Sequence, residues 1–258
     1  MNRPLGVVAL LGAAAFAACD KNAVQELPLA PIAAARIKFF NFGVNNTPGV
    51  NFYANEMKMT AISSGTQTEA TTGVTYGNVG NGGIYSAIAP GTYTLTGRIA
   101  ATTNKDLPID TLSATIADGK FYSFYLSGAY DTTAKRVDAF ILEDPVPAQW
   151  DYAVAYVRFV HAIYNANPMT LYVKNTDTTV TKDSIAIGGA VAYKAASAFT
   201  AVANGVYNLI TRYNDSTSVI SKANVSFVRG HLYTVGARGD ITKTTGTFVP
   251  ALDNTANR

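Results

Sequence analysis

The sequence predicts an all-β protein made of two tandem β-sandwich domains that follow a lipoprotein signal peptide. Three observations lead to this expectation. Short segments rich in Thr, Tyr, Val and Phe alternate apolar and polar residues, which is the pattern of strands with one buried face. These segments occur twice in the same order. An uncharged run followed by the chain's single cysteine stands near the start.

Residues 1–18 have the pattern of an export signal. The segment from Leu5 to Ala18 is 14 residues long and carries no charge. As a helix it would span about 21 Å, which is too short for a hydrocarbon core of about 30 Å. It therefore suits a cleaved secretory signal rather than a permanent membrane span.

Phe16-Ala17-Ala18-Cys19 resembles the lipobox of bacterial lipoproteins, although Phe16 replaces the usual Leu. The resemblance implies cleavage before Cys19 and acylation of its sulfur and its new amine, which anchors a protein stably when more than one chain is attached. The alternative is an ordinary secretory signal with a chance cysteine, but exported cysteines normally pair. We expect export and lipid anchoring to a bacterial cell membrane or outer membrane, facing the periplasm or the cell surface.

Residues 19–34 carry two prolines and no hydrophobic period, so they predict a tether behind the lipidated Cys19. Loss of Arg3 with the signal leaves 19 basic and 17 acidic residues, a net charge of +2. This field is too weak to indicate nucleic acid as a partner. With one cysteine no internal disulfide can form, so buried cores must stabilise the domains.

The predicted domains are residues 35–144 and 153–258, joined by a linker at 145–152 that Pro145 and Pro147 stiffen. We expect Trp150, the only tryptophan, to pin the two domains together. Each domain should hold about seven short strands connected by antiparallel turns. Alternation at the start of each copy predicts a core face and a wet face. The core-face residues are Ile37, Phe39, Val157 and Phe159, and the wet-face residues are Lys38 and Arg158.

The second copy opens with "VRFVHAIYNANPMTLYV", which resembles the bacterial domain-of-unknown-function family 4397 (DUF4397). The matching positions in this copy are Arg158, His161, Ala162, Pro168, Tyr172, Tyr193, Gly205, Tyr207, Gly230, Tyr233 and Thr234. The first copy matches at Lys38, Pro48, Tyr53, Tyr76, Pro90-Gly91-Thr92-Tyr93, Gly119 and Tyr122, with Asn41 in place of the histidine. The resemblance implies exported, often lipid-anchored sandwiches of the immunoglobulin-like or transthyretin-like kind, and no known reaction.

The sequence shows no catalytic constellation, so we do not expect an enzyme. His161 is interpreted as a structural, hydrogen-bonded histidine rather than a zinc ligand, because zinc needs three or four ligands and no His/Cys cluster accompanies it. No metal or cofactor is expected. "GNVGNGGIY" at 77–85 has the glycines of an anion-binding nest but not its strand-to-helix setting, and a turn is predicted there.

Fifteen tyrosines make an aromatic binding surface a hypothesis. Tyr53, Tyr125 and Tyr172 fall opposite the expected core face and are the candidates for stacking on sugar rings or a protein partner. The alternative is that they cover cross-strand neighbours. The sequence thus favours a lipid-anchored, non-catalytic envelope protein that binds glycan or protein. The alternatives are a structural envelope spacer with no ligand and, more remotely, a hydrolase.

Overall fold

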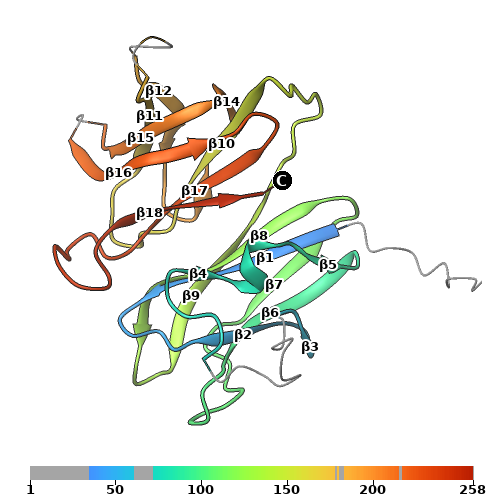
Figure 1. Cartoon of the computed structure of the whole chain (residues 1–258). Coiled ribbons are helices and arrows are strands. Elements are labelled where there is room, and N and C mark those ends of the chain that lie inside the picture. Colours follow the sequence, from blue (N-terminus) through green and yellow to red (C-terminus); the bar gives the residue numbers. More distant parts are fainter. Residues whose placement is uncertain (1–34, 61–71, 178, 180–182, 215–216, 258) are drawn as a thin grey trace, which may run out of the picture. The chain divides into compact units, whose positions relative to one another are not determined.

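The computed structural model describes residues 35–60, 72–177, 179, 183–214 and 217–257 (Figure 1). The predicted signal peptide, Cys19 and the tether lie outside the described residues. All described residues belong to one compact unit that spans Ala33–Arg258. Within them the regular structure is β-strand apart from one short 3-10 helix. The predicted all-β class is confirmed, and the strands form two sandwich-like halves.

The first half contains two sheets and the 3-10 helix η1 (Gly80–Gly83). One sheet has the order β4-β1-β8-β9, and β5 also pairs with β1; the other sheet has the order β3-β2-β6-β7. The strands are β1 (Ala35–Val44), β2 (Val50–Ala54), β3 (Met57–Lys58), β4 (Asn78–Val79), β5 (Ser86–Ile88), β6 (Gly91–Ile99), β7 (Leu112–Ile116), β8 (Phe121–Asp131) and β9 (Arg136–Glu143).

The second half repeats this arrangement. One sheet has the order β13-β10-β17-β18, with β14 also pairing with β10, and the other has the order β12-β11-β15-β16. The strands are β10 (Val154–His161), β11 (Met169–Asn175), β12 (Ile185–Val191), β13 (Ala195–Ala196), β14 (Thr200–Ala203), β15 (Gly205–Arg212), β16 (Ser218–Phe227), β17 (Leu232–Arg238) and β18 (Ala251–Ala256).

Each half has a parallel pair at the centre of one sheet, which corrects the expectation of antiparallel neighbours throughout. β1 runs parallel to β8, with Lys38 opposite Ser123. β10 runs parallel to β17, with Arg158 opposite Thr234. The cause is connectivity, because a parallel partner must be reached by a long crossover. All strands of the second sheet lie between the two parallel strands in the chain: β2, β3, β6 and β7 between β1 and β8, and β11, β12, β15 and β16 between β10 and β17.

The predicted core residues at the start of each half are confirmed. Ile37 and Phe39 are buried in the core of the first half, where Phe39 stacks on Phe52 with ring centroids 5.0 Å apart. Val157 and Phe159 are buried in the core of the second half. Each half therefore has its own hydrophobic core between its two sheets, as a sandwich requires.

The predicted wet face was wrong. Lys38 is 1% exposed and Arg158 is 0% exposed, and β1 is buried along almost its whole length on both faces. The reason is a third apolar cluster, which draws residues from both halves and covers the outer faces of the two sheets that contain β1 and β10. Its buried members are Phe40, Phe42, Tyr125, Phe140, Val160 and Ala162.

Candidate functional site

The three candidate binding tyrosines do not form a common surface. Tyr125 is 1% exposed and stacks between Phe40 and Phe140 in the cluster shared by the halves. The prediction that it is available to a ligand was wrong, because the face that carries it is covered. Tyr53 is buried beneath the Arg98 guanidinium, whose carbon lies 4.3 Å from the ring centroid.

Tyr172 lies at the place in β11 that Tyr53 has in β2. It is half-buried, and the Arg212 guanidinium lies over its ring at 5.4 Å. Tyr53 and Tyr172 each sit diagonally across from an arginine of the neighbouring strand, which is the arrangement that covers a cross-strand neighbour. They belong to different sheets in different halves, so nothing brings their rings together.

His161 is fully buried and both of its ring nitrogens have partners. Nε2 lies 3.1 Å from the Asn167 carbonyl oxygen, and the Ile163 amide lies 3.2 Å from Nδ1. With Nδ1 accepting, the ring is neutral and Nε2–H donates. Burial lowers the pKa of His161 below its ordinary value, which favours this neutral form. The histidine thus ties together the turn that follows β10.

Trp150 lies in the segment between β9 and β10 and packs on the second half. Its ring centroid is 5.4 Å from that of Tyr156 and 6.1 Å from that of Tyr152. Tyr156 belongs to β10, so the tryptophan fixes the end of the linker on the second half. These ring contacts are with one residue of the linker and one residue of the second half.

A cluster of buried charged groups lies at the contact between the halves. Arg158 forms a buried ion pair with Asp144, and Asp144 also accepts hydrogen bonds from Tyr85 Oη (2.5 Å) and Ser123 Oγ (2.7 Å). Lys38 Nζ lies 4.3 Å from the centroid of the Tyr85 ring. Burial lowers the pKa of Lys38 to about 8. Lys38, Asp144 and Arg158 are buried and have hydrogen-bond partners, so the cluster holds structure rather than a substrate.

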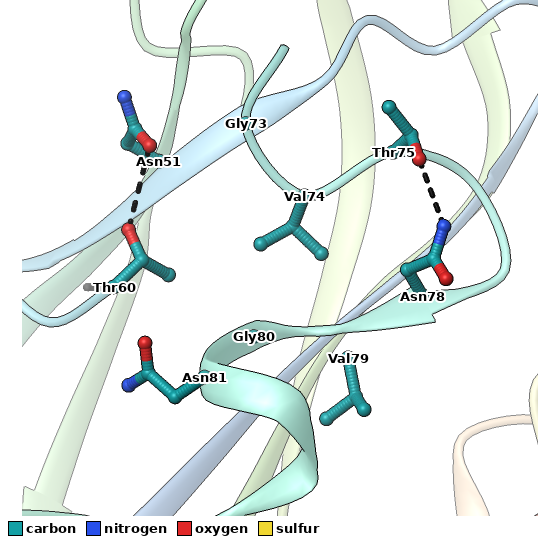
Figure 2. A pocket seen from close by; sticks show the side chains of 9 residues that line it. All are labelled: Asn51, Thr60, Gly73, Val74, Thr75, Asn78, Val79, Gly80 and Asn81. Carbon is teal, nitrogen blue, oxygen red and sulfur yellow. Dashed lines mark hydrogen bonds between the residues drawn. The ribbon is translucent and has the colours of Figure 1, made fainter. Parts of the chain in front are cut away.

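The candidate ligand site is a pocket of about 360 Å³ at one edge of the first half (Figure 2). No charged side chain lines it within the described part of the chain. Its wall consists of neutral polar groups, two valines and two glycines: Asn51, Thr60, Gly73, Val74, Thr75, Asn78, Val79, Gly80 and Asn81. Such a wall offers hydrogen-bond donors and acceptors without a net charge.

The pocket forms where one segment bridges the two sheets of the first half. Val74 exchanges backbone hydrogen bonds with Val50 of β2, at 3.1 Å and 2.7 Å. A few residues later β4 pairs with β1, with Asn78 opposite Asn41. Between these two points the chain must turn, and η1, with Asn81 and Gly82 at positive φ, then links β4 to β5, which also runs antiparallel to β1. The turn predicted in this glycine-rich stretch is present as a short strand followed by a 3-10 turn.

Several of the pocket side chains are held by hydrogen bonds (Figure 2). Asn78 Nδ2 donates to Thr75 Oγ1 at 2.8 Å, and Thr60 Oγ1 lies 3.5 Å from Asn51 Oδ1. Asn81 Nδ2 donates to the Met59 carbonyl oxygen at 2.9 Å. Among the described residues, buried Asn51 Nδ2 has no hydrogen-bond partner. The described lining groups are amides, hydroxyls and apolar side chains, which can form hydrogen bonds and van der Waals contacts with a ligand.

A metal centre and a membrane-spanning helix are two other kinds of functional feature. No three His, Cys, Asp or Glu side chains come together in a group that could hold a metal ion within residues 35–257 as described. Of the helical segments in the described ranges, none has the length and hydropathy needed to cross a membrane.

Comparison with known proteins finds a family match within the second half. Residues 155–258 match the model of a family described as "Domain of unknown function (DUF4397)". The predicted resemblance is thereby confirmed for these residues, and for the first half it stays a prediction. No curated protein matches the chain.

Two solved structures with low similarity are both from bacteria. One is CBMbc (family CBM26) from Eubacterium rectale Amy13K in complex with maltoheptaose, at 12% identity over 86% of this chain and 95% of that one, with a TM-score of 0.25. The other is a "putative cell adhesion protein" from Bacteroides ovatus ATCC 8483, at 14% identity over 87% of this chain and 95% of that one, with a TM-score of 0.24.

Proposed function

We propose that this protein is a lipid-anchored, non-catalytic envelope protein that binds a neutral glycan in the pocket of its first half. The observation that carries the proposal is the chemistry of the pocket wall. Amide and hydroxyl side chains on strands and bonded turns line a space of about 360 Å³, and none of the described lining residues is charged. Sugar hydroxyls both donate and accept hydrogen bonds, so a wall of Asn and Thr side chains complements them.

The location of the pocket supports binding rather than turnover. It opens beside β2 and β4, which belong to the two hydrogen-bonded sheets that enclose the buried core of the first half. A site on such rigid elements loses little freedom when a ligand binds, which favours affinity. A protein ligand fits this site less well, because a stable protein interface needs a contact area larger than the pocket.

The proposed lipid anchor and the proposed cellular location rest on the sequence of residues 16–19. In this proposal Cys19 carries the lipid, the following residues lead to Ala35, and the sandwiches face the periplasm or the cell surface. Mass spectrometry of the mature protein from its membrane fraction tests the anchor. An acylated N-terminal Cys19 is expected, and protease shaving of intact cells then distinguishes the two locations. An unacylated mature terminus contradicts the anchor.

Isothermal titration of residues 20–258 against a panel of neutral oligosaccharides (α- and β-linked glucans, mannans and xylans) tests the binding. We expect at least one neutral glycan to bind, and we expect Asn78→Ala to weaken that binding about tenfold, because one or two hydrogen bonds are lost. Asn208→Ala, on β15 of the second half, is the control and should bind as the wild type does. No binding across the panel, or equal binding by Asn78→Ala, contradicts the proposal.

A further inference from the structure

We infer that the second half braces the glycan pocket of the first half, and that Arg238 and Phe248 are positioning residues for the segment that carries Thr75 and Asn78. This inference rests on the proposed function for its ligand, but the brace itself can be measured without one. Both residues lie more than 150 positions from the pocket in sequence, and neither lines it. They act through Tyr76 and Gly77, which lie between the two lining residues.

The first contact is aromatic. The Tyr76 ring meets the edge of Phe248, with centroids 4.9 Å apart and the planes at 72°. The Arg238 guanidinium lies over the same ring, with its carbon 4.8 Å from the centroid. An edge-to-face pair and a cation–π contact each contribute about 0.5–1.5 kcal/mol. The tyrosine is therefore held from two sides by residues of the second half.

The second contact is steric and explains the glycine at position 77. A Cβ added to Gly77 would lie 3.0–3.2 Å from three atoms of the Arg238 guanidinium. Gly77 has φ +78°, but a positive φ does not by itself require glycine here. The equivalent residue of the second half is Lys194, at φ +66°. The two are equivalent because Gly77 N donates to Asn41 O and Lys194 N donates to His161 O.

The bracing residues are themselves fixed. Arg238 forms an ion pair with Asp253 of the neighbouring strand β18. The carbonyl oxygen of Phe248 accepts a hydrogen bond from the Asp240 amide at 2.9 Å. Tyr76 and Gly77 thus rest on a surface that is held by its own hydrogen bonds and ion pair. This arrangement lowers the freedom of the pocket segment before a ligand arrives, which is the condition for preorganised binding.

The reverse contact also exists, but the strand beside it has a different chemistry. Tyr193, the counterpart of Tyr76, reaches the first half, where its hydroxyl lies 3.4 Å from Asp138 Oδ2 and its ring 6.2 Å from that of Phe140. The strand that follows is β13, whose Ala195 and Ala196 stand where β4 has Asn78 and Val79. These two alanines offer no side-chain hydrogen bond, so the proposed glycan site lies in the first half.

Hydrogen exchange of the full mature chain tests the brace. In Phe248→Ala and in Arg238→Gln, the amides of Gly77 and Asn78 should exchange about tenfold faster, because local opening becomes easier. The amides of β2 should stay as protected as in the wild type. Phe248→Tyr should restore the protection, since it keeps the ring. Asp138→Asn, which disturbs the equivalent contact at Tyr193, is the matched control and should leave Gly77 and Asn78 unchanged.

The binding assay separates this inference from the proposed function. With the tightest oligosaccharide of the panel, Phe248→Ala should bind about tenfold more weakly, and Asp138→Asn should bind as the wild type does. If Asn78→Ala loses affinity while Phe248→Ala keeps both affinity and protection, the brace is overturned and the glycan site stands. If no panel member binds, the glycan proposal fails and hydrogen exchange still decides the brace. If exchange rises equally in β2, Phe248 supports the whole fold and the inference is overturned.

Discussion

Lys38 and Arg158 hold the same position in the two halves, and each donates to the end of the other half's last strand. Lys38 Nζ donates to the Ala256 carbonyl oxygen at 2.6 Å. Arg158 Nη1 donates to the Glu143 carbonyl oxygen at 3.0 Å. Each half therefore contributes one buried cationic side chain that donates a hydrogen bond to the other half, and the contact between them is reciprocal.

The correspondence continues to the next residue of each half, but these two residues differ in charge. After Glu143 comes Asp144, which pairs with Arg158. After Ala256 comes Asn257, whose Oδ1 lies 3.5 Å from Lys38 Nζ. Arg158 is thus paired directly with a carboxylate, whereas the hydrogen bonds of Lys38 among the described residues go to neutral oxygens. This difference separates the expected behaviour of the two cations.

Arg158→Met should destabilise the protein strongly. The change leaves Asp144 buried with no cation, and removal of one partner of a buried pair costs about 3–5 kcal/mol. Chemical denaturation monitored by Trp150 fluorescence measures the free energy of unfolding. Lys120→Met, which breaks the exposed pair of Lys120 and Glu143, is the control and should cost less than about 1 kcal/mol. Equal losses of unfolding free energy in the two variants would show that the buried pair contributes no more than the exposed pair.

Lys38 should make the stability depend on pH in the alkaline range. Its folded-state pKa of about 8 lies below the ordinary 10.5, so the unfolded chain takes up this proton first as the pH falls. Stability should therefore rise from pH 8 toward pH 10.5, by about 1–3 kcal/mol. Lys38→Met removes the titrating group, so the unfolding free energy of the wild type minus that of Lys38→Met should increase as the pH rises across this window. A constant difference from pH 7.5 to 9.5 contradicts the expectation.

The two faces of β1 show what the sequence could and could not predict. Alternation along a strand separates its faces, so Ile37 and Phe39 were correctly assigned to one core. The same alternation does not say whether the other face meets water or another sheet. Lys38 and Arg158 indicated water because isolated charges are rarely buried, but carbonyl oxygens and Asp144 satisfy them. Tyr125 was misassigned for the same reason.

The pocket could not be predicted because its wall comes from distant segments. Asn51 lies on β2, and Asn78 lies on a strand of the other sheet. Each is an ordinary polar residue in its local pattern, and only the pairing of β4 with β1 brings the two sides together. The glycines at 80, 82 and 83 were the one local signal. They indicated a turn correctly, but a turn alone does not reveal the side chains that it faces.

His161→Asn should be tolerated, because the first half already uses asparagine at this position. Asn41 Oδ1 accepts from the Gly43 amide at 3.3 Å, as His161 Nδ1 accepts from the Ile163 amide. Asn41 Nδ2 donates to the Pro48 carbonyl oxygen at 3.2 Å, much as His161 donates after β10. We expect a loss below about 1 kcal/mol for His161→Asn and about 2–3 kcal/mol for His161→Ala, which leaves the buried Ile163 amide unpaired and opens a cavity. Thermal unfolding of both variants measures this, and similar losses would contradict the shared role.

Asp110 should make the protein more stable in mild acid than at neutral pH. One of its carboxylate oxygens accepts from the Gly97 amide at 2.5 Å, and the other is buried without a partner. Burial raises the pKa of Asp110 to about 7, so the unfolded chain loses this proton at lower pH than the folded one. The stability that Asp110 supports is therefore present below about pH 4 and is lost as the pH rises to 7.

Asp110→Asn tests this directly, because the amide cannot ionise and keeps an oxygen for Gly97. At pH 8 the variant should be more stable than the wild type by about 1–3 kcal/mol, since the buried charge is removed. At pH 4 the two proteins should differ little. Asp106→Asn, on the exposed surface of the same connection, is the control and should leave the wild-type pH dependence unchanged. If Asp110→Asn is less stable than the wild type at pH 8, Asp110 is charged and compensated in the folded protein, and the expected acid stabilisation is absent.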